Sequence, residues 1–476
     1  MVAAGERRTS RNASALLLAR LVSAGTTLIL MATLGRMQGA DALGIVGIGM
    51  ATGALLAAVT DLGASLLVIR AIAECEERAR QIIGFLTLLR LLTMPVGLIS
   101  AFLVLASVFP THALAVWLAA AWLTVQQLTE LPRASFMAAG RIGLVAMHVC
   151  AENLLWLAAI MLPLAGGAGM EFSFACGLVV LCFSTVSAYL LLWLLVGWRP
   201  ARPSRQDAAW LLRQTPSFST YAVAVPLYSR VDILLVGALV SGGLATAGGY
   251  FAAMKVITTL EYVPDAVARA AYPGLSRAAI HDPRGLWSVA QGPERLLLWL
   301  SVPLPFGILL AAPWGFPLLF GPEVAPYGWV LACLGLFIPL RWLGYLLGIM
   351  LTSGGAQGRR ALTLLLAAVI VIVLDFVLLP RLGLVGAIIG AAAAWCTVFG
   401  IYATSALRAF GPPNLARTGA VWLGFATLGF VTAIGADWLV GLGRVAPAPL
   451  LVFGLIYAGA SILWRWSMPV TSPYVA

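Results

Sequence analysis

Charged side chains fall inside long apolar stretches of this sequence, where ionised groups are rare. Five are basic: Arg20, Arg90, Arg230, Lys255 and Arg341. Seven are acidic: Asp61, Glu130, Glu152, Asp232, Glu261, Asp265 and Asp375. A charge at the bilayer centre costs at least about 2.5–3.5 kcal/mol, so we expect these groups to line a wet polar pathway. The alternative is ion pairing between helices with snorkelling near helix ends, an interpretation favoured for Glu130, Arg133 and Arg341.

Helical spacing places some of these residues on one face. Lys255, Thr258, Tyr262 and Asp265 recur three or four residues apart, so they form a stripe along a predicted helix over 246–268. A polar stripe on a membrane helix indicates that this face meets water or other polar helices.

Two close pairs predict different behaviour. Arg230 and Asp232 are two residues apart, so they point to different sides of their helix and cannot simply neutralise each other. His148 and Glu152 are four residues apart and can touch, and such a pair could bind a proton near neutral pH. A hydrogen bond that only satisfies a buried histidine is the alternative.

The composition requires membrane helices to position these residues. Hydrophobic residues make up 61% of the 476 residues and charged residues only 10%, and the mean hydropathy is +0.98. Soluble domains carry about 25% charged residues, and apolar runs of about 20 residues indicate membrane spans. The prediction is an all-α polytopic membrane protein with about fourteen helices, near 13–34, 43–69, 82–107, 113–131, 143–164, 171–196, 215–240, 246–268, 294–313, 325–350, 361–379, 383–407, 417–437 and 447–464.

The positions of the arginines orient these spans. With the N-terminus in the cytoplasm, 21 arginines fall in cytoplasmic segments and only Arg36, Arg381 and Arg444 fall on the other side. Because short cytoplasmic loops carry an excess of positive charge, we expect an inner or plasma membrane protein with both termini in the cytoplasm. The net charge of +11 then reflects topology, and no nucleic-acid partner is indicated.

Loops divide the chain into parts. The longest predicted loops are cytoplasmic, at 197–214 and about 269–293, and the Gly411-Pro412-Pro413 break precedes the last helices. The predicted organisation is a six-helix lobe over 1–196, a linker over 197–214, a second six-helix lobe over 215–410 and a helix pair over 411–476. The six cysteines form no CxxC motif or Cys/His cluster, so neither a metal site nor a cofactor is expected.

A weak internal repeat supports two halves. Aligning Gly44 with Gly248 also pairs Met50 with Met254, Leu56 with Leu260, and Asp61 with Asp265. Each half would then carry an acid at the same depth of its second helix. Coincidence between apolar segments is the alternative.

Motifs along residues 10–410 resemble a known family. Residues 228–276 contain Arg230 and Asp232 before an apolar run, then Gly249-Tyr250, Lys255 and Pro273; LGRMQGADALG at 34–44 and WLGYLLGIMLTSGGAQGRR at 342–360 add to the pattern. Their order and spacing resemble those of the oligosaccharide flippases, the Wzx-like exporters of the multidrug/oligosaccharidyl-lipid/polysaccharide exporter superfamily.

This resemblance implies two six-helix lobes around a central cavity, alternating access without ATP hydrolysis, and a polyprenyl-pyrophosphate-linked oligosaccharide as cargo. Arginine suits phosphate by its geometry and permanent charge. The expected pyrophosphate and sugar site comprises Arg20, Arg90, Arg230, Lys255, Thr258 and Tyr262. The expected ion-coupling or cavity residues are Asp61, His148, Glu152, Asp232, Glu261 and Asp265.

The expected partners follow from that resemblance: the lipid-linked oligosaccharide, membrane lipids, H⁺ or Na⁺, and other proteins of polysaccharide assembly. Many relatives have twelve helices, so the predicted pair after Pro413 has no assigned role. A multidrug extruder of the same architecture is the alternative function, although a cavity for cationic drugs should be mainly acidic. An enzyme acting on the same glycolipids is disfavoured, because no predicted outer loop is long enough to hold a catalytic domain.

Overall fold

The protein is all-helical wherever its structure is described. The computed structural model describes residues 2–61, 76–197, 205–281 and 285–411. Within these ranges every regular element is an α-helix, apart from one short 3-10 helix. This confirms the predicted fold class, and the predicted helices 417–437 and 447–464 lie outside the described residues.

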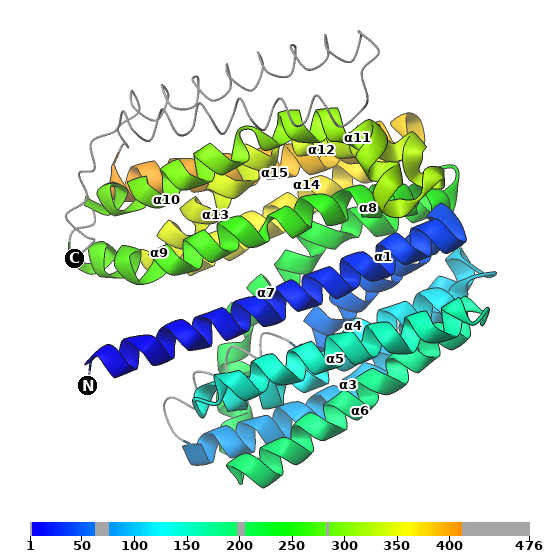
Figure 1. Ribbon diagram of the computed structural model, residues 1–476. Helices are drawn as coiled ribbons and strands as arrows, with labels where there is room; N and C mark the ends of the chain where they lie inside the picture. The colour runs from blue at the N-terminus through cyan, green and yellow to red at the C-terminus, as the bar shows by residue number, and fades with distance from the viewer. Residues whose placement is uncertain (1, 62–75, 198–204, 282–284, 412–476) are drawn as a thin grey trace. The chain divides into compact units, whose positions relative to one another are not determined.

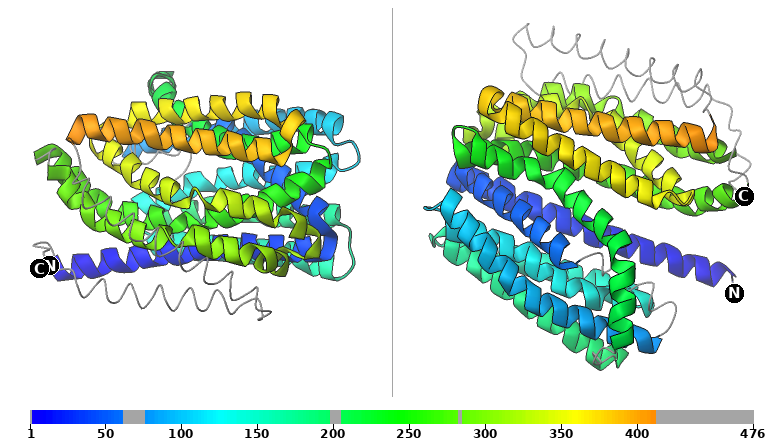
Figure 2. Two further views of the ribbon diagram at one scale, coloured as in Figure 1. Left: turned by 90° about the horizontal axis from the view of Figure 1, so that it is seen from above. Right: turned by 180° about the vertical axis from the view of Figure 1, so that it is seen from behind.

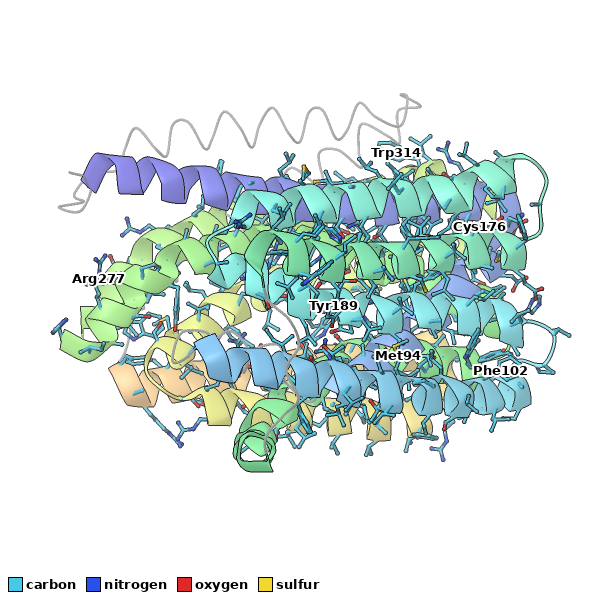
Figure 3. All side chains as sticks on the ribbon, turned by 90° about the horizontal axis from the view of Figure 1, so that it is seen from below. Met94, Phe102, Cys176, Tyr189, Arg277 and Trp314 are labelled. Carbon is cyan, nitrogen blue, oxygen red and sulfur yellow. The ribbon has the colours of Figure 1, made fainter. Side chains whose placement is uncertain are left out.

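The described helices have the length and surface of membrane spans. Eight are long and apolar enough to cross a bilayer, and nine if the bent pair Pro322–Gly335 and Ile338–Ser353 is one span. In α3 (Glu76–Val108) only 11% of the most apolar window is buried. Leu103 and the labelled Phe102 are exposed on this helix (Figure 3). Large apolar faces of this kind need lipid around them, so the chain is a multi-pass membrane protein.

The first of two compact units comprises Met1–Ala252 and Gly358–Ala394. Here α1 contacts α4, α5 and α7, while α4 also contacts α3 and α6 (Figure 1). The turns after α3 and α5 lie at the same end of this unit, together with the break in α1. Besides α3, its helices are α1 (Val2–Asp61), α4 (Ala113–Ala138), α5 (Ile142–Ala165), α6 (Met170–Val196), α7 (Arg205–Leu239), the first half of α8 (Gly243–Leu260), most of α14 (Gln357–Leu382) and the start of α15 (Leu384–Phe410).

The second unit comprises Ala253–Gln357 and the described residues from Trp395 to Gly411. In it α9 contacts α10 and α13, and α11 contacts α12. Figure 2 shows these helices from two further sides. Besides the ends of α8 and α15, the described elements are α9 (Tyr262–His281), α10 (Leu286–Ser301), α11 (Leu304–Phe320), the 3-10 helix η2 (Pro322–Tyr327), α12 (Gly328–Gly335) and α13 (Ile338–Ser353).

The second half of α1 and the start of α8 cross at glycines that the repeat aligns. Gly39 breaks α1 at φ 81°, and Gly243 opens α8 at φ 45°; both are positive angles that favour glycine. A Cβ on Gly44 would overlap the Leu244 carbonyl oxygen, and a Cβ on Gly248 would overlap the Ala40 carbonyl oxygen. The aligned residues of this crossing, Gly39 and Gly243, Ala40 and Leu244, and Gly44 and Gly248, are each 204 positions apart. Such a reciprocal contact supports the internal repeat.

Several predicted boundaries are wrong. The predicted helix 246–268 is divided at Glu261, because Pro264 lacks an N–H and fits best in the first turn of a new helix. The predicted loop 269–293 is largely helical, since α9 continues to His281 and α10 begins at Leu286. Likewise α7 begins at Arg205, inside the predicted linker 197–214. The division into lobes at 1–196 and 215–410 stays a prediction.

Candidate functional site

Two buried carboxylates meet in the first unit, on α7 and α14. Asp232 is 3% exposed and Asp375 is 0% exposed, and the two are close enough to interact electrostatically. Asp232 accepts a hydrogen bond from the Tyr250 hydroxyl at 2.7 Å and one from the Ile233 N–H at 2.9 Å. Both oxygens of Asp375 are buried without a hydrogen-bond partner among the described residues. We call Asp232 and Asp375 the carboxylate pair.

The three polar residues of this region lie at one depth. Asp232 is seven residues from the end of α7, Tyr250 seven from the start of α8, and Asp375 seven from the end of α14. At 1.5 Å per residue, each is about 10 Å along its helix from that end. Gly383, just after α14, lies beside Val240, just after α7, so these helix ends coincide.

Space for Asp375 is provided by a glycine on α15. A Cβ on Gly390 would overlap an Asp375 oxygen, so the carboxylate packs directly against the backbone of that helix. Two adjacent carboxylates in a dry environment cannot both stay ionised unless a cation or a shared proton neutralises them. The arrangement can therefore bind a proton or a small cation such as Na⁺, which prefers oxygen ligands.

Arg90 is held inside the first unit by a carboxylate. Its side chain is 1% exposed, it forms an ion pair with Asp61, and it donates to the Gln127 carbonyl at 2.6 Å. Nearby, the hydroxyl groups of Thr87 and Tyr189 are 2.9 Å apart (Figure 3). The structure therefore brings together two predicted site residues, Arg90 and Asp61, in the ion pairing between helices that was the alternative to an open pathway.

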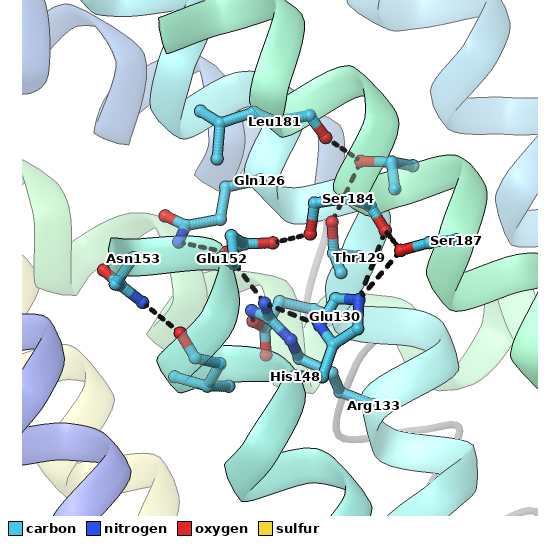
Figure 4. A network of polar contacts seen from close by, with 12 residues as sticks. Gln126, Thr129, Glu130, Arg133, His148, Glu152, Asn153, Leu181, Ser184 and Ser187 are labelled. Atoms are coloured by element: carbon cyan, nitrogen blue, oxygen red, sulfur yellow. Dashed lines mark hydrogen bonds and ion pairs between the residues drawn. The ribbon is translucent and has the colours of Figure 1, made fainter. Parts of the chain in front are cut away.

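A second buried cluster connects α4, α5 and α6 (Figure 4). Arg133 is 4% exposed and forms ion pairs with Glu130 at 2.9 Å and Glu152 at 2.7 Å. Its Nη2 lies 3.4 Å from Nδ1 of His148. Gln126 donates to Glu152 at 3.0 Å, and the Ser184 hydroxyl also donates to Glu152. These residues, with Ser187, are called the Arg133 cluster.

These ion pairs confirm the ion-pairing interpretation for Glu130 and Arg133. The predicted helix ended at residue 131, before Pro132, whereas α4 continues to Ala138. The two glutamates make burial of the guanidinium tolerable, and the loss of one backbone hydrogen bond at Pro132 is smaller than that gain. His148 and Glu152, four residues apart on α5, both contact Arg133.

The second unit has its own charged cluster at the break between α8 and α9. Glu261 forms an ion pair with Arg341 of α13 and accepts a hydrogen bond from the Tyr345 hydroxyl at 3.1 Å. The guanidinium carbon of Arg341 lies 4.1 Å from the ring centre of Trp395. These contacts confirm the ion-pairing interpretation for Arg341, and they engage Glu261, a predicted cavity acid.

The polar stripe on 246–268 does not continue as one face. Thr258 donates to the Lys255 carbonyl at 3.2 Å. Tyr262 and Asp265 belong to the next helix, where Asp265 pairs with Arg269 at 2.9 Å. Lys255 and Tyr262 are half-buried in the second unit.

The remaining predicted phosphate ligands belong to the first unit. Arg20 is exposed on α1, and Arg230 is half-buried on α7. Their role as phosphate ligands stays a prediction. Asp375 was recognised from the sequence as an acid inside a span, but not as a site residue. The available signal was its position as the single acid of an otherwise apolar helix, α14.

A family model described as polysaccharide biosynthesis protein matches residues 9–279. A comparison with curated proteins finds no match.

Similar folds occur in membrane transporters. A structure of the lipid II flippase MurJ in an inward closed conformation superposes with a TM-score of 0.74 at 12% identity, covering 95% of this chain and 98% of that one. An inward-facing multidrug resistance MATE family transporter of the MOP superfamily gives 0.64 at 17%, covering 82% and 94%. A MOP superfamily transporter from Pyrococcus furiosus, described as having a binding pocket of reverse polarity, gives 0.56 at 15%, covering 82% and 95%.

Proposed function

Because the chain belongs to the polysaccharide biosynthesis protein family, we propose that it is a flippase, which moves a polyprenyl-pyrophosphate-linked oligosaccharide across the cytoplasmic membrane by alternating access. The family match over residues 9–279 is the observation that carries this proposal. The fold shared with the lipid II flippase along 95% of the chain supports it. The protein would act as a transporter and not as an enzyme. It would lie in an inner or plasma membrane, with both termini on the cytoplasmic side.

The proposed cargo needs cations for its pyrophosphate. Arg20, Arg230 and Lys255 are the candidates, because each is a cation within an apolar stretch and none of the three side chains is fully buried. Arginine binds phosphate oxygens through a planar fork of donors, and lysine acts as a point charge. Thr258, one turn beyond Lys255 on α8, and Tyr262, the first residue of α9, offer hydroxyl groups to the sugar.

The carboxylate pair is proposed as the site for the coupling ion. Asp375 has no hydrogen-bond donor among the described residues, so a proton or Na⁺ would supply the positive charge that two buried carboxylates require. An ion bound there would be transported in the direction opposite to that of the lipid. Other proteins of polysaccharide assembly are further expected partners.

Reconstituted vesicles test this proposal. The protein is inserted into liposomes with a fluorescent polyprenyl-diphospho-oligosaccharide, and a membrane-impermeant quencher reports how much label has crossed. Arg20→Ala and Lys255→Ala are expected to slow transport at least about tenfold, which corresponds to about 1.4 kcal/mol. Arg269→Ala is the matched control, because this exposed arginine pairs with Asp265 one helical turn away. Equal rates in all three variants would remove Arg20 and Lys255 from the substrate site.

One observation favours a second function, a multidrug extruder. Related folds include multidrug resistance MATE transporters, and a buried carboxylate pair could attract a cationic drug. Deleting the gene and exposing cells to cationic dyes tests this alternative. Sensitised cells, together with vesicles that do not move the lipid-linked oligosaccharide, would favour the extruder over the flippase.

A further inference from the structure

The junction between α8 and α9 is a single residue, Glu261. Pro264, in the first turn of α9, has no N–H, so the usual helical bond to the carbonyl four residues before it is missing. The regular pattern resumes where the Asp265 N–H donates to the Glu261 carbonyl at 3.2 Å. Before the junction, Thr259 donates to the Lys255 carbonyl at 2.7 Å, and a side-chain bond of this kind tends to bend a helix. The backbone alone therefore does little to fix the angle between the two helices.

The side chain of Glu261 is held from α13. Arg341 and Tyr345 are four residues apart on that helix, so they share a face. Arg341 forms an ion pair with one carboxylate oxygen of Glu261, and the Tyr345 hydroxyl donates to the other at 3.1 Å. The side chains of Arg341 and Glu261 are only 9% and 11% exposed, so water competes little for either. Two donors on one helix face leave this carboxylate little freedom to turn.

The guanidinium of Arg341 is itself held by aromatic rings. Its central carbon lies 4.1 Å from the ring centre of Trp395 on α15, within the range of a cation–π contact. The rings of Trp395 and Phe337 meet at 65°, with their centres 5.8 Å apart. Phe337 directly precedes α13, one turn before Arg341. Helices α13 and α15 together therefore fix the place of the cation that binds Glu261.

The pair of Glu261 and Arg341 carries no net charge, so any effect on an anionic cargo must come through position. Lys255 belongs to α8, whereas Tyr262 is the first residue of α9. Their relative places therefore depend on the angle at the junction. A site built from several polar groups is weakened when one of them is displaced by about 1 Å.

We propose that Glu261 is a positioning residue: held by Arg341 and Tyr345, it fixes the angle between α8 and α9, and thereby the place of Tyr262 relative to Lys255. This inference rests on the proposed function, because it takes Lys255 and Tyr262 as ligands of the lipid-linked oligosaccharide. It gives Glu261 a role other than that of the ion-coupling or cavity acid expected from the sequence.

Spin-label distances test the junction itself, without any lipid substrate. Labels are introduced through a non-canonical amino acid at the exposed positions Ser241 and Ile280. These positions lie near the far ends of α8 and α9, so their separation reports the angle between the helices. We expect a broader distance distribution in Glu261→Gln, which keeps the shape of the side chain but loses the ion pair, than in the wild type. Arg269→Ala is the matched control and should leave the distribution unchanged, because its pair with Asp265 lies within α9. An unchanged distribution in Glu261→Gln would overturn the proposal.

Transport kinetics test the consequence for the cargo. In reconstituted vesicles, Glu261→Gln should raise the apparent KM for the fluorescent polyprenyl-diphospho-oligosaccharide about tenfold and leave the maximal rate per folded protein nearly unchanged, because binding is weakened and the transport step is not. The charge-swapped double variant Glu261→Arg/Arg341→Glu restores an ion pair between the same positions and should lower the KM again. Tyr345→Phe removes only one hydrogen bond and should give an intermediate KM, even where the charge variants fold poorly.

The outcomes separate a positioning role from a structural one. A lower maximal rate at unchanged KM in both Glu261→Gln and Tyr345→Phe would show that Glu261 only stabilises the fold, and would contradict the proposal. A wild-type protein that moves no lipid-linked oligosaccharide would refute the flippase instead, and the spin-label distances would still decide whether Glu261 fixes the junction.

Discussion

The crossing of α1 and α8 leaves no room for a side chain at either central glycine. In Gly248→Ala the added Cβ would overlap the Ala40 carbonyl oxygen and lie 2.7 Å from the Gly44 nitrogen. Non-bonded heavy atoms in ordinary contact are about 3.5 Å apart. Both obstacles are backbone atoms of a helix, which cannot rotate away as a side chain could, so the two helices must separate.

The magnitude follows from that separation. Moving the helices apart by about 1 Å loses a quarter to a half of the dispersion energy of each contact across the crossing. Overpacking of this kind costs about 1–3 kcal/mol, and we expect Gly248→Ala at the upper end of that range. In Gly25→Ala, also within a membrane helix, the Cβ would meet no atom within 4 Å; its stability should be unchanged or slightly raised, because alanine favours helix.

Equilibrium unfolding in mixed micelles, followed by tryptophan fluorescence, measures these differences. The reciprocal geometry makes a sharper prediction for the double variant Gly44→Ala/Gly248→Ala. One substitution already separates the helices, so the second should cost less, and the sum of the single effects should exceed the double effect by at least about 0.5 kcal/mol. Strictly additive effects, or a Gly248→Ala protein as stable as Gly25→Ala, would refute the close crossing.

Four further substitutions test the charged clusters. Asp375→Asn should raise the free energy of unfolding in the absence of added Na⁺ by about 1 kcal/mol or more, because it removes repulsion with Asp232; lower stability in a chemical denaturation series would contradict the carboxylate pair. Arg133→Gln should lower the free energy of unfolding by about 3–5 kcal/mol, since it leaves a buried carboxylate unpaired. Glu130→Gln removes a partly exposed carboxylate and should lower it by less than about 1 kcal/mol. Similar values for the two variants would argue against this ranking. Tyr345→Phe removes one hydrogen bond to a carboxylate and should lower stability by about 1.5–3 kcal/mol, and a neutral effect in thermal unfolding would show that the bond contributes nothing.

Much of the fold could be predicted from the sequence because membrane helices have a strong local signal. The helices 361–379 and 383–407 correspond closely to α14 and α15, since long apolar runs bounded by charge or glycine leave little choice. The break at Glu261 and the helical stretch up to His281 were missed. They depend on how a proline and several charged residues pack beyond the apolar segment, which periodicity does not specify.

The candidate site was predicted less completely, because charge pairing is a property of three dimensions. The sequence placed Arg90 and Asp61 in spans but could not show that they neutralise each other across two helices. It identified Asp232, but its neighbour Asp375 is 143 positions away along the chain (375 − 232). Spacing along one helix predicted that His148 and Glu152 could touch, because four residues form about one turn, and in the structure both contact Arg133.

Competitive transport in one preparation of vesicles tests the central claim most directly. The reconstituted protein is given a fluorescent polyprenyl-diphospho-oligosaccharide and a fluorescent cationic dye together, and the initial rates of both are recorded with and without an imposed ion gradient. We expect the labelled lipid-linked oligosaccharide to cross faster than in protein-free vesicles. Unlabelled polyprenyl-diphospho-oligosaccharide should slow this movement, while unlabelled dye should not. Movement of the dye alone, with the labelled lipid staying in its original leaflet, would contradict the flippase.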